Sequence, residues 1–359
     1  MSHHRLLSRL VGMTSLIVIG GGYAGLLAAN RAAAQHLDVT LVSDREVLVD
    51  RIRLHEVIAG SREPGTATRR LSESVHGPRL VLARAVRVAD GPEQASVTLD
   101  DGGTLTADHV VLATGSGHGV GGWEWALRHR EAVRALPGGA TVCVLGGGFT
   151  GIETAAEVAE ARPDLHVTLA DPVPVGSAFS APGRTRLLTS LARLGVAVSS
   201  TPVDADHVIE CTGFTPDSLA VTSGLPTTPA GFVEVDEHLR VRGARHLWAC
   251  GDAARVVGQP HLRMSCAGGV PMAAHLADTL GRLHRGQPAR PVSVGYAGWC
   301  LSLGRHDGLI QWVDRDDSPT GRVTAGRLGA VLKELVCRFA VLSPIRWARI
   351  YRGLEGPRG

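Results

Sequence analysis

The stretch Ser15-Leu16-Ile17-Val18-Ile19-Gly20-Gly21-Gly22-Tyr23-Ala24-Gly25 decides the fold of this chain. An apolar run typical of a buried parallel strand ends in glycines spaced as G-x-G-x-x-G, and an alanine-rich helical stretch follows. Gly20 allows a tight turn, Gly22 lets backbone N–H groups approach a pyrophosphate, and Gly25 lets the helix pack closely on the strand. The helix N-terminus offers further N–H groups to phosphates. We therefore expect a dinucleotide at this turn.

The same pattern returns at 141–151 as Thr-Val-Cys-Val-Leu-Gly-Gly-Gly-Phe-Thr-Gly. Its glycines are Gly146, Gly148 and Gly151, again between a predicted strand and a predicted helix. One such motif is weak evidence, because glycine-rich turns are common. Two copies in strand–turn–helix context predict two bound dinucleotides, an arrangement typical of flavin enzymes that take hydride from a nicotinamide.

The composition is that of an ordinary globular protein, with 44% hydrophobic and 20% charged residues over 359 residues. The net charge is only +3, and aromatic residues make up 4%. A nucleic-acid-binding surface is therefore not expected. The six cysteines are scattered without a C-x-x-C pair, so we expect neither a metal site nor disulfides, and a reducing cytoplasm is the natural compartment.

Residue patterns along the chain predict the order of its elements. Residues 1–13 are expected to form a mobile leader that is not a signal peptide. Two βαβ units follow, with strands predicted at 16–19, 38–42, 141–145 and 166–170 and helices at 23–35 and 150–160. The stretches 79–90 and 95–116 predict a meander in the first unit. The second unit, with a helix at 183–194 and a strand at 196–199, has no room for one and should be trimmed. Further predictions are a helix over 51–60, one around 124–135 and one at 267–284, and strands at 232–235 and 239–241.

The order of motifs resembles the flavoproteins with two dinucleotide-binding domains, the pyridine-nucleotide oxidoreductases, and among them the type II NADH dehydrogenase-like reductases. Five motifs carry this resemblance over about residues 14–284: GGGYAG (20–25), LATGS (112–116), GGGFTGIETAAE (146–157), IECTGFTPD (209–217) and WACGDAA (248–254). The resemblance implies an α/β fold with two Rossmann-like domains and a small C-terminal αβ module. The implied segments are 14–116 and 229–284 (FAD domain), 117–228 (inserted NAD(P)H domain) and 285–359 (C-terminal interface module).

The resemblance also implies the FAD-binding residues. Asp252 matches the aspartate that bonds the ribityl chain in this family. An acid is expected after the second strand, but Ser43 stands there with Asp44 next to it. Either Ser43 makes a weaker neutral hydrogen bond, or Asp44 takes the role. The full set expected to contact FAD is Gly20, Gly22, Tyr23, Ala24, Gly25, Ser43, Asp44, Arg51, Ala113, Thr114, Gly115, Gly251, Asp252 and Ala267.

At the second site the corresponding acid is present as Asp171. A carboxylate bonds a free ribose 2′-OH and repels a 2′-phosphate, which favours NADH over NADPH. Glu153 is either a contact for the nicotinamide half of the cofactor or an exposed helix glutamate. The set expected to contact NAD(P)H is Gly146, Gly148, Phe149, Thr150, Gly151, Glu153, Asp171, Thr212 and Gly213.

No side chain is firmly expected to act as a catalytic acid or base. Arg53 and His55 fall near the flavin by the same resemblance, with an arginine-rich surface helix as the alternative. Cys266 lacks a visible partner thiol, and the C-x-x-x-x-C of the disulfide reductases is absent. That branch of the family is therefore excluded.

The tail at 326–353 alternates apolar residues with arginines. It predicts either an amphipathic helix at a membrane surface or a helix that packs on the protein or on a second copy in a homodimer, with Pro344 expected to interrupt it.

The sequence thus predicts an FAD-dependent oxidoreductase that passes hydride from NAD(P)H to an unidentified small-molecule acceptor or redox partner. The protein is expected in the cytoplasm, with peripheral membrane contact as an option. A specialised biosynthetic flavoenzyme with a degenerate nicotinamide site is the first alternative, and a flavin-loaded scaffold is the second.

Overall fold

The first glycine-rich stretch folds as the predicted strand, turn and helix. In the computed structural model, which describes residues 13–117 and 119–357, β1 (Ser15–Ile19) leads through the turn into α2 (Tyr23–Ala33). β2 (Asp38–Ser43) then pairs parallel to β1. The apolar residues of both strands are buried, as a parallel sheet covered on both faces requires. The predicted leader lies almost entirely outside the described residues.

Five parallel strands form the sheet of the first domain, in the order β15-β9-β1-β2-β5. β9 (His109–Leu112) and β5 (Arg79–Leu82) come from the first segment, whereas β15 (Leu247–Ala249) arrives after the inserted domain. The predicted meander is present as β6 (Ala85–Asp90), β7 (Ala95–Leu99) and β8 (Thr104–Ala107). The stretch 79–90 is however divided, because its first residues pair with β2 in the main sheet.

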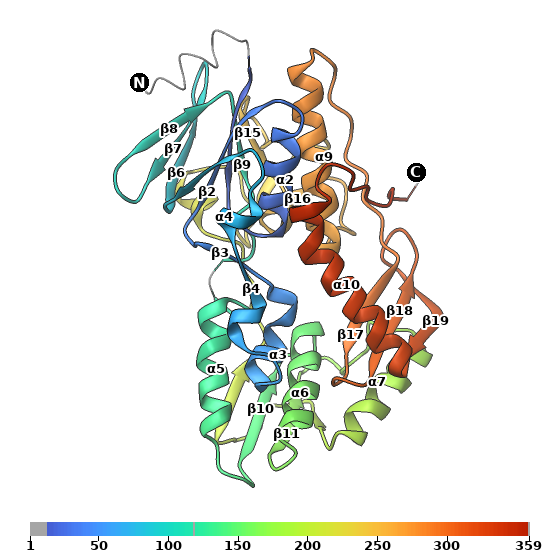
Figure 1. The fold of residues 1–359 in the computed structure, drawn as a ribbon. Helices are drawn as coiled ribbons and strands as arrows, with labels where there is room; N and C mark the ends of the chain where they lie inside the picture. The colour runs from blue at the N-terminus through green and yellow to red at the C-terminus, as the bar shows by residue number, and fades with distance from the viewer. Residues whose placement is uncertain (1–12, 118, 358–359) are drawn as a thin grey trace.

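A chain excursion toward the second domain follows β2 (Figure 1). It contains β3 (Val47–Val49), a 3-10 turn (Arg51–Arg53), α3 (Leu54–Ala59), a second 3-10 turn (Pro64–Ala67), β4 (Thr68–Arg70) and α4 (Leu71–Ser74). The helix predicted over 51–60 is therefore shorter. It ends at Gly60, whose φ of +83° suits glycine.

The second domain is trimmed, as predicted. Its four parallel strands lie in the order β12-β11-β10-β13, with no meander before the last strand. The elements are α5 (Trp123–Ala135), β10 (Thr141–Leu145), α6 (Phe149–Ala161), β11 (His166–Ala170), α7 (Ala181–Arg193), β12 (Ala197–Ser199) and β13 (His207–Glu210). The turns after β1 and β10 both point toward the middle of the molecule (Figure 1).

The chain then returns to the first domain. α8 (Leu219–Thr222), β14 (Val233–Val235), β15, a 3-10 turn (Gly251–Ala253), β16 (Ala254–Val256) and α9 (Cys266–His284) follow in order. The strand predicted at 239–241 is absent as a strand, because these residues form only the isolated bridges Val235–Val241 and Arg240–Trp248. α9 packs against α2.

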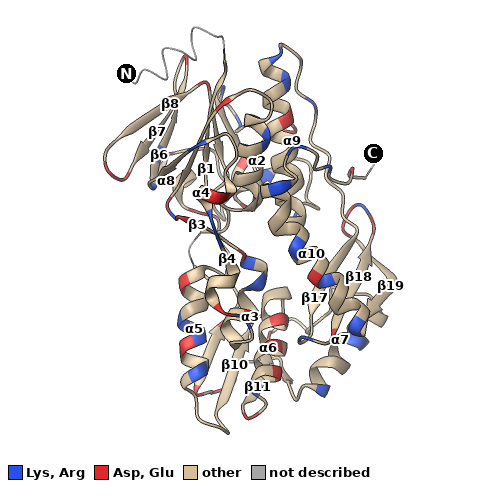
Figure 2. Cartoon of the chain, in the orientation of Figure 1, with Lys and Arg blue, Asp and Glu red and all other residues tan. Residues whose placement is uncertain are grey.

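The C-terminal module bridges both domains. β17 (Gly298–Ser302), β18 (Gly308–Val313) and β19 (Pro319–Ala325) form an antiparallel sheet, and α10 (Gly326–Arg346) packs on this sheet and on α2. The prediction that Pro344 interrupts the helix is wrong. Pro344 lies in its last turn, where the Ala340 carbonyl that would otherwise pair with its missing N–H accepts from the Ser343 hydroxyl at 3.4 Å. Around the middle of the molecule α6 carries acidic residues, whereas α10 carries charged residues of both signs (Figure 2).

Candidate functional site

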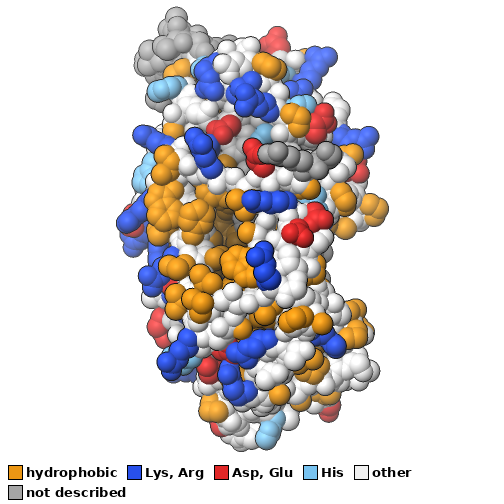
Figure 3. Space-filling model, turned by 90° about the vertical axis from the view of Figure 1, so that its right-hand side faces the viewer, with side chains coloured by type: hydrophobic (Ala, Val, Ile, Leu, Met, Phe, Trp, Pro, Cys, Tyr) orange, Lys and Arg blue, Asp and Glu red, His pale blue; other side chains and the backbone are white. Residues whose placement is uncertain are grey.

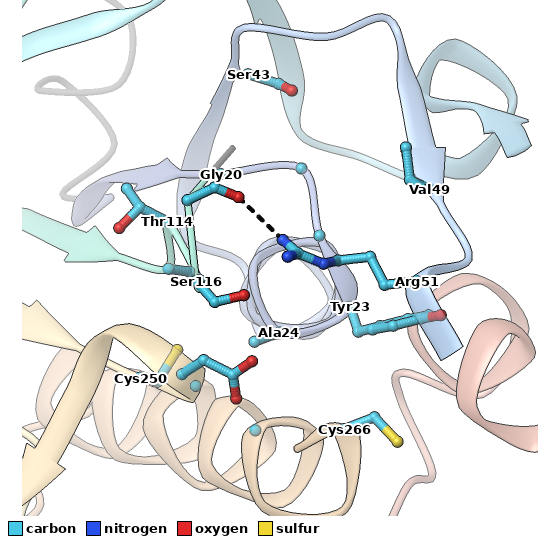
Figure 4. A pocket seen from close by; sticks show the side chains of 18 of the residues that line it. Gly20, Tyr23, Ala24, Ser43, Val49, Arg51, Thr114, Ser116, Cys250 and Cys266 are labelled. Atoms are coloured by element: carbon cyan, nitrogen blue, oxygen red, sulfur yellow. Dashed lines mark hydrogen bonds between the residues drawn. The ribbon is translucent and has the colours of Figure 1, made fainter. Parts of the chain in front are cut away.

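A pocket of about 890 Å³, open to solvent, lies at the carboxyl ends of β1, β2, β9 and β15. Most residues expected to contact FAD line it: Gly20, Gly22, Tyr23, Ala24, Ser43, Asp44, Arg51, Ala113, Thr114, Gly115, Gly251 and Asp252 (Figure 4). The edge where parallel strands end is where such sheets bind ligands. The first turn, the excursion after β2 and the return segment thus meet in one site.

The glycines of the first turn are required by close backbone packing. Gly20 has a φ of +113°, and a Cβ there would clash with the Ala113 carbonyl. A Cβ on Gly25 would meet the Gly20 carbonyl, so α2 packs directly on the turn. Gly22, by contrast, has no atom within 4 Å of the position of a Cβ. That open space lies where a pyrophosphate would approach the backbone.

The pocket is prepared for a negatively charged group. The N-termini of α2 and α9 both border it, through Gly22 and Ser265, and each offers unpaired N–H groups. Arg51 reaches in from the excursion, where Nη1 donates to the Gly117 carbonyl at 3.1 Å (Figure 4). Its Nη2 is buried and has no hydrogen-bond partner among the described residues. A buried guanidinium nitrogen needs an acceptor, and a cofactor phosphate fits that need.

The two polar side chains at the end of β2, Ser43 and Asp44, differ in their surroundings. The Ser43 hydroxyl is buried and donates to the Arg45 carbonyl at 2.9 Å within its own turn. Asp44 is exposed and borders this pocket and a smaller adjoining one beside Arg84 and Ala85. The sequence did not predict that Arg84 and Ala85 form part of a pocket wall, because no motif marks these two residues.

Asp252 lies in the wall of the pocket. Burial raises the pKa of this carboxyl, and Arg51 counteracts the shift. The wall also contains Ser265, the N-cap of α9, and Cys266 and Gly269 within α9. None of the three belongs to the set of residues expected to contact FAD. Ala267 is displaced from its expected place, since it borders the neighbouring apolar cavity instead of this pocket.

The second turn repeats the geometry of the first. Gly146 has a φ of +110°, and a Cβ there would press on Thr212 and on the Cys211 backbone. A Cβ on Gly151 would meet the Gly146 carbonyl. Thr212 is thereby placed beside the glycine turn, while Gly213 follows it with a φ of +77°. Gly148, at the N-cap of α6, is open like Gly22, and Phe149 and Thr150 begin the helix.

Asp171 is held at this turn by the backbone. Its carboxylate accepts from the Gly147 N–H at 2.5 Å and from the Val173 N–H at 2.7 Å. The carboxylate therefore stands directly behind the glycine turn, at the end of β11. This is the place from which an acid reaches the ribose hydroxyls of a dinucleotide.

Glu153 is buried and paired, so the exposed-glutamate alternative is wrong. Oε1 lies 2.7 Å from Lys333 Nζ on α10 and accepts from the Ser302 N–H at 2.8 Å. Burial raises its pKa, but Lys333 and His55 more than offset this, so the pKa of Glu153 is lowered. Glu153 therefore joins the second domain to the C-terminal module. Lys333 is the only lysine in the sequence, and this rarity was a signal that could have directed attention to the pair.

Arg53 and His55 lie in the same buried charge network and not in the wall of the first pocket. Arg53 pairs with Glu56 at 2.9 Å and with Glu334 at 2.7 Å. His55 is buried with Nδ1 3.8 Å from Glu153 Oε2, and burial lowers its pKa. The alternative of an arginine-rich surface helix is wrong, because every residue of α3 is buried.

The sequence pattern of pyridine nucleotide-disulphide oxidoreductases matches residues 14–201 and 196–279. The chain belongs to this family. It is therefore an oxidoreductase that uses FAD and NAD(P)H, of the NADH dehydrogenase-like kind. An NADH dehydrogenase-like protein of Mycobacterium tuberculosis is 32% identical over 354 residues, with 81% of this chain and 86% of that protein covered. Human ferroptosis suppressor protein 1 is 25% identical, with 84% and 89% covered.

Solved structures of the same fold agree. A sulfide:quinone oxidoreductase from Aquifex aeolicus superposes with a TM-score of 0.78 at 16% identity, over 94% of this chain and 92% of that one. NDH2 from Plasmodium falciparum in complex with NADH has a TM-score of 0.73 at 14% identity, over 94% and 98%. Both likenesses confirm the predicted α/β architecture.

Within this family the present chain carries no cysteine pair among its described residues. All six cysteines are free thiols. Cys266 borders the first pocket, and burial raises its pKa to about 11, so it is a neutral thiol at physiological pH. The described residues also hold no group of three or more histidine, cysteine or acidic side chains placed to bind a metal.

Proposed function

We propose that this oxidoreductase passes electrons from NADH to a lipophilic quinone. FAD held by the residues of the first pocket would supply the redox chemistry, coupling two-electron oxidation of NADH to two-electron, two-proton reduction of the quinone. The observation that carries the proposal is an apolar cavity of about 1770 Å³ that adjoins the first pocket. Cys266 and Val270 line both spaces.

The cavity lies between α10, the β17–β18 hairpin and the start of α9. Its walls are almost entirely apolar, with Ile310, Trp312, Leu335, Phe339 and Trp347 among them. Such a lining accommodates a hydrophobic ring with a hydrocarbon tail and does not suit a hydrophilic metabolite. A sulfide:quinone oxidoreductase shares the fold, which is consistent with a quinone in this place.

The face of α10 that borders the cavity is open to solvent and suggests how a lipophilic acceptor arrives. Leu335, Val336 and Phe339 are 55%, 41% and 47% exposed, and Ile350 is 74% exposed. Figure 3 shows a hollowed hydrophobic area on this side of the molecule with basic side chains around it. Arginines of this segment include Arg338, Arg346, Arg349 and Arg352. Apolar side chains ringed by cations fit the surface of an anionic lipid bilayer.

No helix among residues 13–117 and 119–357 is long and apolar enough to cross a bilayer. Contact with lipid would therefore be through the α10 face. In the structure α10 also packs on the protein itself, so the two readings of the tail are compatible: one face packs inward and the other is available for lipid.

NADH is proposed as the donor because Asp171 stands at the ribose position of the second turn. The FAD contacts proposed are those that line the first pocket, with Asp44 in place of Ser43. The division of the chain at 14–116, 117–228, 229–284 and 285–359 is likewise our proposal, supported by the return of β15 to the first sheet.

The test separates the two half-reactions in an anaerobic stopped-flow instrument. NADH and NADPH are mixed in parallel with the oxidised enzyme, and the reduced enzyme is then mixed with a short-chain ubiquinone or with ferricyanide. We expect rapid reduction by NADH and rapid reoxidation by the quinone. Reoxidation by ferricyanide alone would refute the quinone proposal. If neither nucleotide bleached the flavin, the biosynthetic alternative with a degenerate nicotinamide site would replace it.

Phe339→Asp tests the cavity and the lipid contact together. We expect it to slow reoxidation by the quinone and to reduce cosedimentation with phosphatidylglycerol-containing vesicles, while reduction by NADH stays unchanged. Val86→Asp is the matched control, since Val86 is 43% exposed on the remote meander. Equal effects of the two substitutions would contradict the assignment of this face.

A further inference from the structure

Three aromatic rings from distant parts of the chain meet at the second glycine turn. Phe149 is the first residue of α6, Phe179 precedes α7, and Trp299 comes from β17 of the C-terminal module. Their ring centroids are 5.3 to 5.8 Å apart, with Phe179 and Trp299 edge to face. We call Phe149, Phe179 and Trp299 the aromatic wall. Phe179 and Trp299 are each 7% exposed, while Phe149 is only partly buried.

Asp317 holds this wall in place. It lies in the tight turn between β18 and β19 with a φ of +70°, a conformation that is uncommon outside glycine. Oδ1 accepts from the Trp299 indole N–H at 2.7 Å, and Oδ2 pairs with Arg263 Nε at 2.5 Å. Both carboxylate oxygens are therefore used. A strained residue with a fully used side chain points to a positional role.

Arg263 connects the wall to the first pocket. Its guanidinium carbon lies 5.6 Å from the centre of the Phe149 ring and 5.0 Å from that of Tyr296. Its charge is also close enough to Asp252 to help lower the pKa of that carboxyl. Arg263 thus stands between the aspartate of the first pocket and the first residue of α6.

The position of Phe149 on α6 shows which way the wall faces. Phe149 and Glu153 are four residues apart, so they share one face of the helix. Glu153 on that face contacts Lys333 and Ser302, which belong to the module beside the first pocket. The face with Phe149 is therefore directed toward the C-terminal module, and Arg263 connects it to the flavin domain.

We propose that Trp299 and Asp317 are positioning residues for hydride transfer. The C-terminal module supplies the rigid backing that orients the partly exposed Phe149 ring, along which the nicotinamide half of the donor reaches the flavin. Hydride transfer depends on the two rings being held at close range, and a shift of 1 Å can slow a reaction by about a hundredfold. The two bonded carboxylate oxygens of Asp317 hold Trp299 and Arg263 in place beside the Phe149 ring, which keeps that ring in a fixed position. The inference rests on flavin reduction by NADH and not on the identity of the acceptor.

Trp299→Phe and Asp317→Asn test this in the FAD-loaded enzyme. The first keeps a ring and removes the N–H, and the second keeps an acceptor for the indole and removes the charge opposite Arg263. We expect flavin reduction at saturating NADH to slow by roughly ten- to a hundredfold. The long-wavelength charge-transfer absorbance of reduced enzyme with NAD⁺ should weaken. The dissociation constant of NAD⁺ for the oxidised enzyme, measured by calorimetry, should change less than the reduction rate.

Two matched substitutions serve as controls. Asp316→Asn changes the neighbouring turn residue, whose Oδ1 accepts from the Ser318 N–H at 3.1 Å. Trp123→Phe changes a partly buried tryptophan on α5. In both variants NADH should reduce the flavin at the wild-type rate. The rate of reoxidation by ferricyanide should be the same in all five proteins.

Reduction of Trp299→Phe and Asp317→Asn at the wild-type rate would overturn the inference. So would a parallel loss of reduction, reoxidation and thermal stability, since that would assign the wall to the fold in general. The wild type in the same series shows whether NADH reduces the flavin at all. A failure there would refute the donor assignment, whereas failure of the quinone alone leaves this inference intact.

Discussion

The ammonium group of Lys333 lies 2.7 Å from Oε1 of Glu153, and both side chains are largely buried. One partner belongs to α10 and the other to α6, so this ion pair crosses from the C-terminal module to the second domain. Burial lowers the pKa of Lys333, but Glu153 reverses the shift and raises it. Both groups therefore remain charged, because the charge of each one offsets the cost of burying the other.

Removing either partner should destabilise the protein. Because a buried charge would be left unpaired, Lys333→Met or Glu153→Gln is expected to lower the free energy of unfolding by about 3–5 kcal/mol. The double variant should lose less than the sum of the two. Thermal and urea unfolding of all four proteins forms the cycle. Strict additivity would mean that the pair contributes no mutual stabilisation.

Asp171 should set the choice between the two nicotinamide donors. Asp171→Ala removes the carboxylate behind the second turn, so the ratio of kcat/KM for NADH to that for NADPH should fall by roughly tenfold. Flavin reduction by each nucleotide measures the ratio. Asp164→Ala removes an acid exposed on the same domain and should leave the ratio unchanged. An unaltered ratio in Asp171→Ala would place the selectivity elsewhere.

Arg51 should contribute strongly to FAD affinity. Its unpartnered Nη2 would gain a charge-assisted hydrogen bond, so Arg51→Met should raise the dissociation constant by roughly ten- to a hundredfold. Flavin fluorescence during titration of the apoprotein provides the value. Arg69→Met, at an exposed position on β4, is the comparison. If both variants retained FAD equally, Arg51 would be filling the pocket wall without binding phosphate.

The histidine pair of the second domain should make stability depend on pH. His129 Nδ1 lies 2.9 Å from His207 Nε2, and burial together with His207 lowers the pKa of His129 to about 4. Between pH 6.5 and 4 the unfolded chain therefore binds a proton at His129 that the folded chain does not, so stability falls as the pH falls.

His129→Gln should remove part of that fall, on the order of 1 kcal/mol at pH 4.5 because the residue is partly exposed to solvent. Thermal unfolding at pH 7 and pH 4.5 gives the comparison. His166→Gln, an exposed histidine on β11, should show the full wild-type loss. An equal loss in His129→Gln would assign the acid sensitivity to other groups.

The two βαβ units could be predicted almost to the residue, because each depends on local signals. The predicted strand at 141–145 is β10 itself, and the predicted helix at 150–160 is α6 with one more residue at each end. Glycine positions at both turns also follow from backbone packing that any such unit requires. Asp171 could be predicted for a similar reason, because it directly follows the second strand of its unit, where an acid for the ribose is expected.

The parts that depend on distant partners could not be predicted. Glu153 was open between two roles because Lys333 and Ser302 come from another segment. The excursion with Arg53 and His55 is buried by α5 and α6, which no local pattern indicates. The strand expected at 239–241 has an alternating pattern, but its neighbours offer only single bridges. The apolar cavity under α10 has no linear motif at all.

The position of β15 at the edge of the first sheet has a consequence for how the chain reaches this structure. β9 obtains its second neighbour only when Leu247–Ala249 is available, and α2 is fully covered only by α9 and α10. During synthesis the inserted domain, whose strands all lie between residues 141 and 210, can assemble first. The first domain to be translated is then the last to mature. Nascent chains stopped before residue 247 should bind chaperones through the uncovered faces of β9 and α2, and FAD would find its pocket only after α9 has emerged.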